Sequence, residues 1–172
     1  IIEHLHNEPK RTMPPIRGVC KFTQDERIAA MKANLAQKHD DLSVIQDERA
    51  KYEAGTALVL GGGPSADDHI EEIKQRQRDG AHLFCIDRMY PWCVTHGITP
   101  EYVVALDGCE DVIDGFTHLL PGVQYLIGTS VQPKAVELLS ACEVYYYNAP
   151  MPSHAKVQNY WCEMGYTRVT VV

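Results

Sequence analysis

Residues 57–68 read Ala57-Leu58-Val59-Leu60-Gly61-Gly62-Gly63-Pro64-Ser65-Ala66-Asp67-Asp68, and this stretch decides the fold. Its first four residues are apolar and predict a short buried strand. The three glycines allow a sharp turn, and the proline that follows suits the first turn of a helix. A strand that enters a helix through a glycine-rich loop is the opening unit of a Rossmann-like sheet.

The same alternation of strand and helix continues to the end of the chain. Apolar runs bounded by Gly, Pro or Asp predict strands at 56–60, 81–86, 102–106, 123–127, 144–147 and 168–172, with helices between them. Strands that are apolar throughout belong to parallel sheets covered by helices. We therefore expect an α/β fold, with a Rossmann-like, doubly wound, mostly parallel sheet of about five to six strands.

The segment before Gly55 has a different composition. It is polar and helix-prone, and the pairs Thr23/Glu26 and Ser43/Gln46 predict two capping boxes. We expect residues 1–54 to form a helical N-terminal extension and residues 55–172 a Rossmann-like nucleotide-binding domain. The last residues resemble the start of a strand, so we expect this domain to be truncated and the chain to be a fragment.

Composition excludes several classes of protein. The chain has 16 Lys plus Arg and 23 Asp plus Glu, a formal net charge of −7, which disfavours binding to nucleic acid. No apolar run is long enough to cross a membrane, and the first ten residues do not form a signal peptide. The six cysteines include no Cys-x-x-Cys pair, so we interpret them as reduced and the protein as cytoplasmic. Oligomeric state is left open.

The glycine-rich loop is suited to a phosphate group. Gly61, Gly62 and Gly63 let the backbone approach a ligand, and the helix after them offers unpaired N–H groups. Pro64 has no N–H to donate, while Ser65 either caps the helix or contacts the phosphate. The loop lacks the third glycine of the dinucleotide fingerprint and the Gly-Lys-Ser/Thr ending of a Walker loop. A tight turn without a ligand is the alternative.

Two aspartates follow neighbouring strands. Asp87 ends the second predicted strand at a spacing typical of a ribose-binding acid, and Asp107 ends the third. Because carboxyl ends of parallel strands share one edge, both are expected near the loop, where Asp107 is also a candidate Mg²⁺ ligand. Each aspartate alone is equally well explained as a helix or turn cap. For Thr129, Ser130 and Asn148, after later strands, a plain loop is favoured.

Two linked motifs carry a resemblance to a known family. Gly-Gly-Gly-Pro-Ser is followed by Gly97-Ile98-Thr99-Pro100-Glu101-Tyr102-Val103-Val104-Ala105-Leu106-Asp107. Together they resemble a family that includes the motility-associated-factor flagellin glycosyltransferases and the archaeal hydroxymethylpterin diphosphokinases. The loop is also similar to that of bacterial sialyltransferases that use a CMP-activated sugar. The match spans about residues 56–108, and Glu101 replaces the family's aspartate.

The resemblance implies a nucleotide-dependent group transferase. It places the donor phosphates at Gly61 to Ser65, with Asp87 close to the donor and Asp107 as the catalytic or metal-binding residue. The donor is a small molecule, either a CMP-sugar or ATP with Mg²⁺, and the acceptor is not identified. Family members continue into a further Gly-rich segment, which this chain lacks. An NAD(P)-binding oxidoreductase and a non-catalytic nucleotide-binding module are the alternatives.

Overall fold

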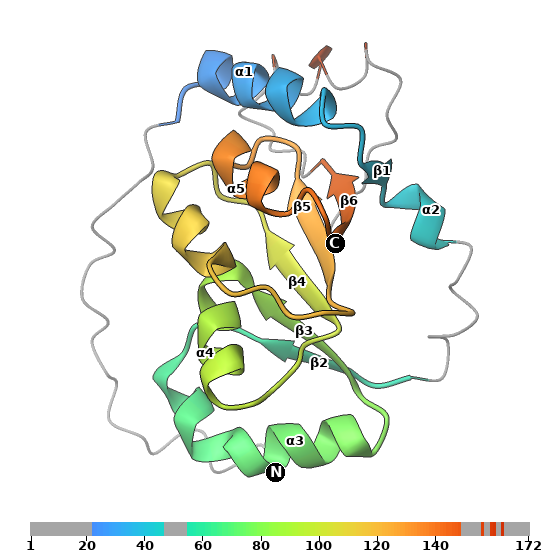
Figure 1. Ribbon diagram of the computed structural model, residues 1–172, viewed down its shortest axis with the longest axis vertical. Coiled ribbons are helices and arrows are strands. Elements are labelled where there is room, and N and C mark those ends of the chain that lie inside the picture. Colours follow the sequence, from blue (N-terminus) through green and yellow to red (C-terminus); the bar gives the residue numbers. More distant parts are fainter. Residues whose placement is uncertain (1–21, 47–54, 149–155, 157–158, 161–162, 164–172) are drawn as a thin grey trace, which may run out of the picture.

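The computed structural model describes residues 22–46, 55–148, 156, 159, 160 and 163. They form one six-stranded parallel sheet in the order β1-β6-β5-β4-β3-β2 (Figure 1). The strands are β1 (Asp40–Asp41), β2 (Ala57–Leu60), β3 (His82–Ile86), β4 (Tyr102–Ala105), β5 (Gln124–Gly128) and β6 (Glu143–Tyr147). The α/β, Rossmann-like fold class predicted from the sequence is confirmed.

Helices connect each strand to the next. The α-helices are α1 (Gln24–Leu35), α2 (Ser43–Gln46), α3 (Ile70–Arg78), α4 (Tyr90–Thr95) and α5 (Pro133–Leu138). Three 3₁₀ helices precede or replace predicted α-helices: η3 (Pro64–His69), η4 (Asp87–Met89) and η5 (Glu110–Phe116). The predicted strand at 168–172 lies outside the described residues, and the sixth strand is instead the short β1.

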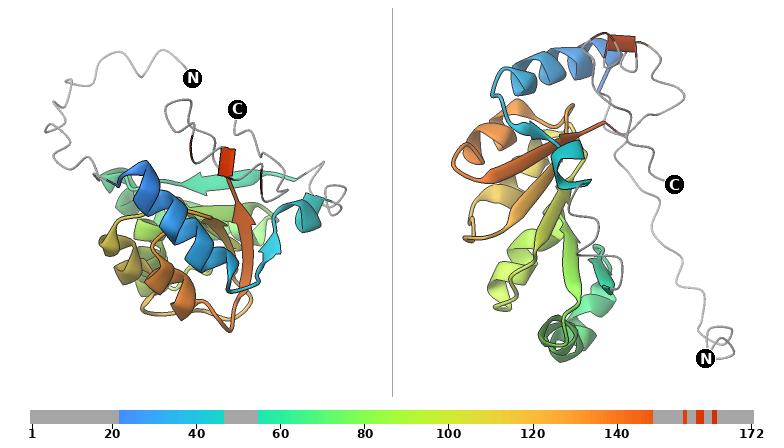
Figure 2. Two further views of the ribbon diagram at one scale, coloured as in Figure 1. Left: turned by 90° about the horizontal axis from the view of Figure 1, so that it is seen from above. Right: turned by 90° about the vertical axis from the view of Figure 1, so that its right-hand side faces the viewer.

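The two faces of the sheet differ in burial. Side chains alternate along each strand, and one face carries the core residues Leu83, Cys85, Val103, Tyr125, Ile127 and Tyr146, all at most 1% exposed. Strands β2 to β6 follow one another across the sheet, so right-handed crossovers place α3, α4 and α5 on that same face (Figure 2). On the second face, within the described part, Leu42 and Ile45 around α2 line a small pocket with Phe84, Tyr102 and Leu126.

The helix starts only partly follow the predicted caps. Thr23 and Glu26 form the expected capping box at the start of α1. Ser43 is the first residue of α2, and its N–H donates to Asp41 Oδ1 at 2.8 Å. The predicted partner of its capping box, the side chain of Gln46, lies outside the described residues. Ser65 is not a helix cap, because η3 begins at Pro64 and Gly63 is the N-cap residue. The N-cap residue is therefore two positions before the serine that the sequence offered as a cap.

Strand β2 forms one edge of the described sheet. It pairs only with β3 among the described strands, and Val59 on this edge is 74% exposed.

No helix within the described ranges is long and apolar enough to cross a membrane.

The core face predicts a clear difference between two leucine truncations. Leu83→Ala in β3 removes a side chain that is 0% exposed, so we expect the free energy of unfolding to fall by about 2–5 kcal/mol. Leu138→Ala in α5 removes a leucine that is 46% exposed and should cost under about 1 kcal/mol. Urea denaturation measures both, and equal losses would contradict the assignment of the core face.

Candidate functional site

The glycine-rich loop leaves the carboxyl end of β2 as predicted. Its residues 61–65 are all exposed. The N–H of Gly63 is already used, because it donates to Gly61 O at 2.9 Å. The N–H groups of Gly62 and Ser65 have no backbone partner in the described part of the chain. The loop therefore offers two free amides and the Ser65 hydroxyl to an anion at the start of η3.

The loop is also close to the next strand. A Cβ built at Gly62 would meet only Ile86 Cδ1, at 3.6 Å, which is an ordinary contact. Ile86 immediately precedes Asp87, so the loop and the end of β3 are neighbours. A side chain at Gly62 would fill the space above the loop and would not disturb the packing below it.

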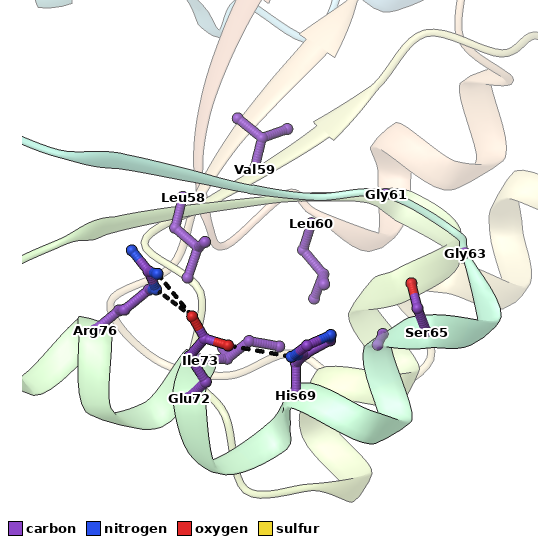
Figure 3. A pocket seen from close by; sticks show the side chains of 11 residues that line it. Leu58, Val59, Leu60, Gly61, Gly63, Ser65, His69, Glu72, Ile73 and Arg76 are labelled. Atoms are coloured by element: carbon purple, nitrogen blue, oxygen red, sulfur yellow. Dashed lines mark hydrogen bonds and ion pairs between the residues drawn. The ribbon is translucent and has the colours of Figure 1, made fainter. Parts of the chain in front are cut away.

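A pocket of about 360 Å³ lies beside the loop, between β2 and the helix that follows (Figure 3). Leu58, Leu60 and Ile73 make its apolar wall, and Gly61, Gly63, Ser65 and His69 lie at its loop end. This volume falls within the range of small-molecule sites. All the residues that line the pocket belong to β2, the loop, η3 and α3, and none belongs to β3 or β4.

Glu72 organises the polar rim of this pocket. Its carboxylate accepts from Arg76 at 2.9 and 2.6 Å and contacts His69 Nδ1 at 3.1 Å (Figure 3). The Arg76 hydrogen bond is the main reason that the pKa of Glu72 is lowered, with a smaller contribution from His69. Arg76 is therefore already paired, which reduces its value as a phosphate-binding cation.

Asp87 lies at the carboxyl end of β3, within η4, and is only 8% exposed. Its Oδ1 accepts the N–H of Arg88 at 2.9 Å. Burial raises the pKa of Asp87 above its ordinary value of 3.8, and the nearby charges of Asp107 and Asp111 raise it further, while Arg88 opposes the shift. The backbone around Asp87 is tightly packed, because a Cβ at Gly115 would lie 2.8 Å from its carbonyl oxygen.

Asp107 follows β4 and is exposed. Its Oδ1 accepts the N–H of Cys109 at 3.1 Å. Ligand atoms of Asp107, Cys109 and Asp111 lie within 4.8 Å of one another. The structure thus brings Asp87 and Asp107 into one electrostatic neighbourhood, as predicted, and adds Asp111. Asp111 could have been identified from the sequence as a second acidic residue four positions after Asp107.

The donor set of this cluster restricts which metal fits. Cys109 is disulfide-bonded, so the expectation that all cysteines are reduced is wrong for this residue. A disulfide sulfur is not a thiolate and does not ligate a metal. Two exposed carboxylates remain, which suits Mg²⁺ completed by substrate oxygens and water. Asp111 also forms an ion pair with Arg88. The Arg88 guanidinium and a bound Mg²⁺ would therefore compete for the Asp111 carboxylate.

The departure at Glu101 lies away from this site. Glu101 precedes β4, at its amino end, and its Oε2 contacts His82 Nδ1 at 2.5 Å across the neighbouring strand. Glu101, which stands in place of the family's aspartate, therefore lies at the opposite end of β4 from Asp107.

The buried carboxyl of Asp87 predicts a pH-dependent stability. In the folded state it holds its proton more tightly than in the unfolded chain, so stability falls as pH rises from 3.8 to the folded-state pKa and is then constant. We expect Asp87→Asn, which keeps the acceptor for Arg88 N–H, to gain stability over the unaltered chain as pH increases through this range. Urea denaturation between pH 4 and 8 measures the difference. The exposed Asp114→Asn is the control; equal pH profiles for both variants would refute the cost of burying Asp87.

Comparison with known proteins identifies a family and several individual similarities, two of which are described below. The family described as 6-hydroxymethylpterin diphosphokinase MptE-like matches residues 30–171. A Treponema pallidum (strain Nichols) protein, described only as uncharacterized, is 37% identical over 51 residues, covering 30% of this chain and 24% of that protein.

A solved structure has a similar fold. The MAf glycosyltransferase from Magnetospirillum magneticum AMB-1 superposes with a TM-score of 0.54 at 21% identity, over 76% of this chain and 21% of that one. The chain thus spans about a quarter or less of the length of these two relatives. The family match extends well beyond the two motifs quoted above and covers the second half of α1 and the whole described sheet, so the chain belongs to the MptE-like family.

Proposed function

We propose that this chain binds ATP with Mg²⁺ and serves in the transfer of a diphosphoryl group to an alcohol. The observation that carries the proposal is the pair of carboxylates, Asp107 and Asp111, on the edge of the sheet that also holds the phosphate-type loop. Mg²⁺ bound to phosphates prefers one or two carboxylates of this kind. The family to which the chain belongs, 6-hydroxymethylpterin diphosphokinase MptE-like, supports the same reaction class.

The order of the strands suggests how the nucleotide lies. Neighbouring strands are ~4.8 Å apart, so the carboxyl ends of β2 and β4 are separated by roughly 10 Å. A nucleoside in the pocket beside β2 would direct its phosphates over Gly62 and Ser65, and the terminal phosphates toward Asp107. Both the loop amides and the carboxylate pair are then used by one extended ligand.

The chemistry of the transfer needs positioning more than acid–base catalysis. The acceptor oxygen bonds to the β-phosphorus of ATP, the bond from that phosphorus to the bridging oxygen breaks, and AMP leaves with the electron pair. The hydroxyl proton passes to solvent at the exposed rim. Mg²⁺, when bound, would neutralise developing charge on the phosphate oxygens. Asp107 and Asp111 hold it, while the Gly62 and Ser65 amides fix the phosphate position.

A second candidate is glycosyl transfer from a CMP-sugar. It is favoured by the small number of free donors in the loop, because Gly63 N–H is occupied and two amides suffice for a single phosphate. This donor would not need the carboxylate pair. Its dependence on Mg²⁺ therefore separates the two candidates.

The loop assignment is tested by Gly62→Val. A Cβ at this position makes only an ordinary contact with Ile86 Cδ1, so we expect the ligand-free thermal midpoint to change little, while any stabilisation by nucleotide should be lost. Thermal shift against Mg²⁺-ATP, CMP and NAD measures this, and NAD alone shifting the midpoint would favour an oxidoreductase. Ala57→Val, at the other end of β2, is the control. A full nucleotide shift in Gly62→Val would contradict the assignment.

The metal assignment is tested by Asp107→Asn. The amide still accepts from Cys109 N–H but is a poor Mg²⁺ ligand, so we expect ATP affinity in the presence of Mg²⁺ to fall about tenfold or more. Affinity for ATP without Mg²⁺ should stay the same. Calorimetric titration measures both, with Asp114→Asn as the matched control. Mg²⁺-independent ATP binding in the unaltered chain would remove the basis for the carboxylate pair as a metal site.

A further inference from the structure

Three carboxylates gather where β3 and β4 end. Asp87 is 8% exposed, and the charges of both Asp107 and Asp111 act on it. Within the described part of the chain, each carboxylate accepts hydrogen bonds at one oxygen only: Asp87 Oδ1 from Arg88 N–H, Asp107 Oδ1 from Cys109 N–H, and Asp111 Oδ2 from the Arg88 guanidinium. Three carboxylate oxygens are left over, one of them on a buried side chain, and such a group is stabilised by a cation.

The sulfur of Cys109 belongs to the same group of side chains. Ligand atoms of Asp107, Cys109 and Asp111 all lie within 4.8 Å of one another. Cys109 is half-buried and forms a disulfide, whereas the other cysteines of the described ranges are free: Cys85, Cys93 and Cys142. The residue bonded to Cys109 therefore lies outside those ranges. In this state the sulfur is beside two carboxylates but is not a metal ligand.

The backbone that carries this sulfur is held by contacts other than the disulfide. Cys109 is the N-cap residue of η5, and its N–H donates to Asp107 Oδ1 at 3.1 Å. Gly108 is packed so closely that an added Cβ would lie 2.8 Å from the Phe22 ring and 3.1 Å from Ser130 O. Opening the disulfide therefore leaves the Cys109 sulfur next to the two carboxylates.

Reduction changes the ligands that this group offers. A dithiol opens the disulfide by thiol–disulfide exchange. Its two sulfurs bond to each other, the S–S bond of the protein breaks, and its two protons end on Cys109 and on the former partner sulfur. A divalent cation that binds afterwards replaces the Cys109 thiol proton, which passes to the buffer. The result is one thiolate and two carboxylates from one short segment of chain.

This set of ligands favours a different metal from the carboxylate pair alone. Mg²⁺ takes oxygen ligands in octahedral geometry, whereas a thiolate favours Zn²⁺ and similar ions. Three protein ligands and one water are an ordinary coordination for Zn²⁺. The Arg88 side chain that pairs with Asp111 is 64% exposed, so a cation displaces it at little cost.

We propose that reduction of the Cys109 disulfide creates a site for Zn²⁺ or a similar cation, formed by Asp107, Cys109 and Asp111. The consequence for activity rests on the proposed function, which assigns the same two carboxylates to Mg²⁺. Zn²⁺ bound to the triad occupies these carboxylates and blocks the binding of Mg²⁺-ATP. The redox state of one cysteine thereby selects the metal at the end of β4.

Co²⁺ tests the site directly, because it takes zinc ligands and its thiolate complexes have a charge-transfer band in the near ultraviolet. The chain is reduced with dithiothreitol, desalted under argon and titrated with Co²⁺ in parallel with the oxidised chain. We expect the band only after reduction, together with an increase in Co²⁺ affinity of about tenfold or more. Cys109→Ser should show neither change. Cys142→Ser, which removes a half-buried free thiol, is the matched control and should show both.

The serine variant also separates a ligand from a cross-link, because it has neither the disulfide nor the thiolate. Co²⁺ affinity in Cys109→Ser as high as in the reduced unaltered chain would assign the effect to the lost cross-link and overturn the proposal. So would a band that persists in Cys109→Ser, a disulfide that dithiothreitol does not open, no gain in affinity on reduction, or a reduced chain that circular dichroism shows to be unfolded.

A second titration tests the consequence for the nucleotide. After loading with one equivalent of Zn²⁺, the reduced chain should bind Mg²⁺-ATP about tenfold or more weakly than before loading, and the oxidised chain as well as before. Equal effects on both forms would overturn the selection of the metal by redox state. Absence of Mg²⁺-ATP binding in both forms before Zn²⁺ is added would overturn the proposed function instead, and the Co²⁺ result would be unaffected.

Discussion

The parallel pairing of five consecutive strands is the constraint on which the rest of the structure depends. Since β2 to β6 pair in chain order, each following loop emerges at the same edge and one strand spacing from the last. Chemistry-bearing residues that lie up to 87 positions apart, from Gly61 to Asn148, thereby form a single row. Position along this row separates the glycine-rich loop after β2 from the carboxylate of Asp107 after β4 and the buried amide of Asn148 after β6.

Helix α1 fixes the other boundary of the row. Two contacts attach this helix to the sheet. Near its carboxyl end, Asn34 donates hydrogen bonds to the turn after β5, and just before its amino end Phe22 packs on the glycine after Asp107. Tyr146 adds a bond from its hydroxyl to Asn34 O at 2.8 Å. The segment before Gly55 also supplies β1, so it packs directly against the sheet. It closes the carboxyl edge on the side opposite the glycine-rich loop.

The sequence predicted the strands well and the helices less well. Apolar runs between Gly, Pro and Asp placed β2 to β6 within one or two residues, because burial on parallel strands leaves a clear pattern. The 3₁₀ character of 64–69 and 110–116 was not readable, since both segments contain helix-compatible residues and depend on tertiary packing. In the site, Gly61–Ser65, Asp87 and Asp107 followed from motif spacing. Asn148 was named from the sequence only as a loop residue after a strand, and Asn34 was not identified, because an unpartnered buried amide is a property of three-dimensional packing.

Strand β2 has no partner on its outer side among the described strands, which has a consequence for handling the protein. Alternate residues of a strand direct their N–H and C=O groups to opposite sides, so those of Ala57 and Val59 face away from β3. Neither residue is charged, and such a strand is a template on which a second polypeptide can add. A lysine introduced at position 59 would act as a gatekeeper against this association without touching the core face.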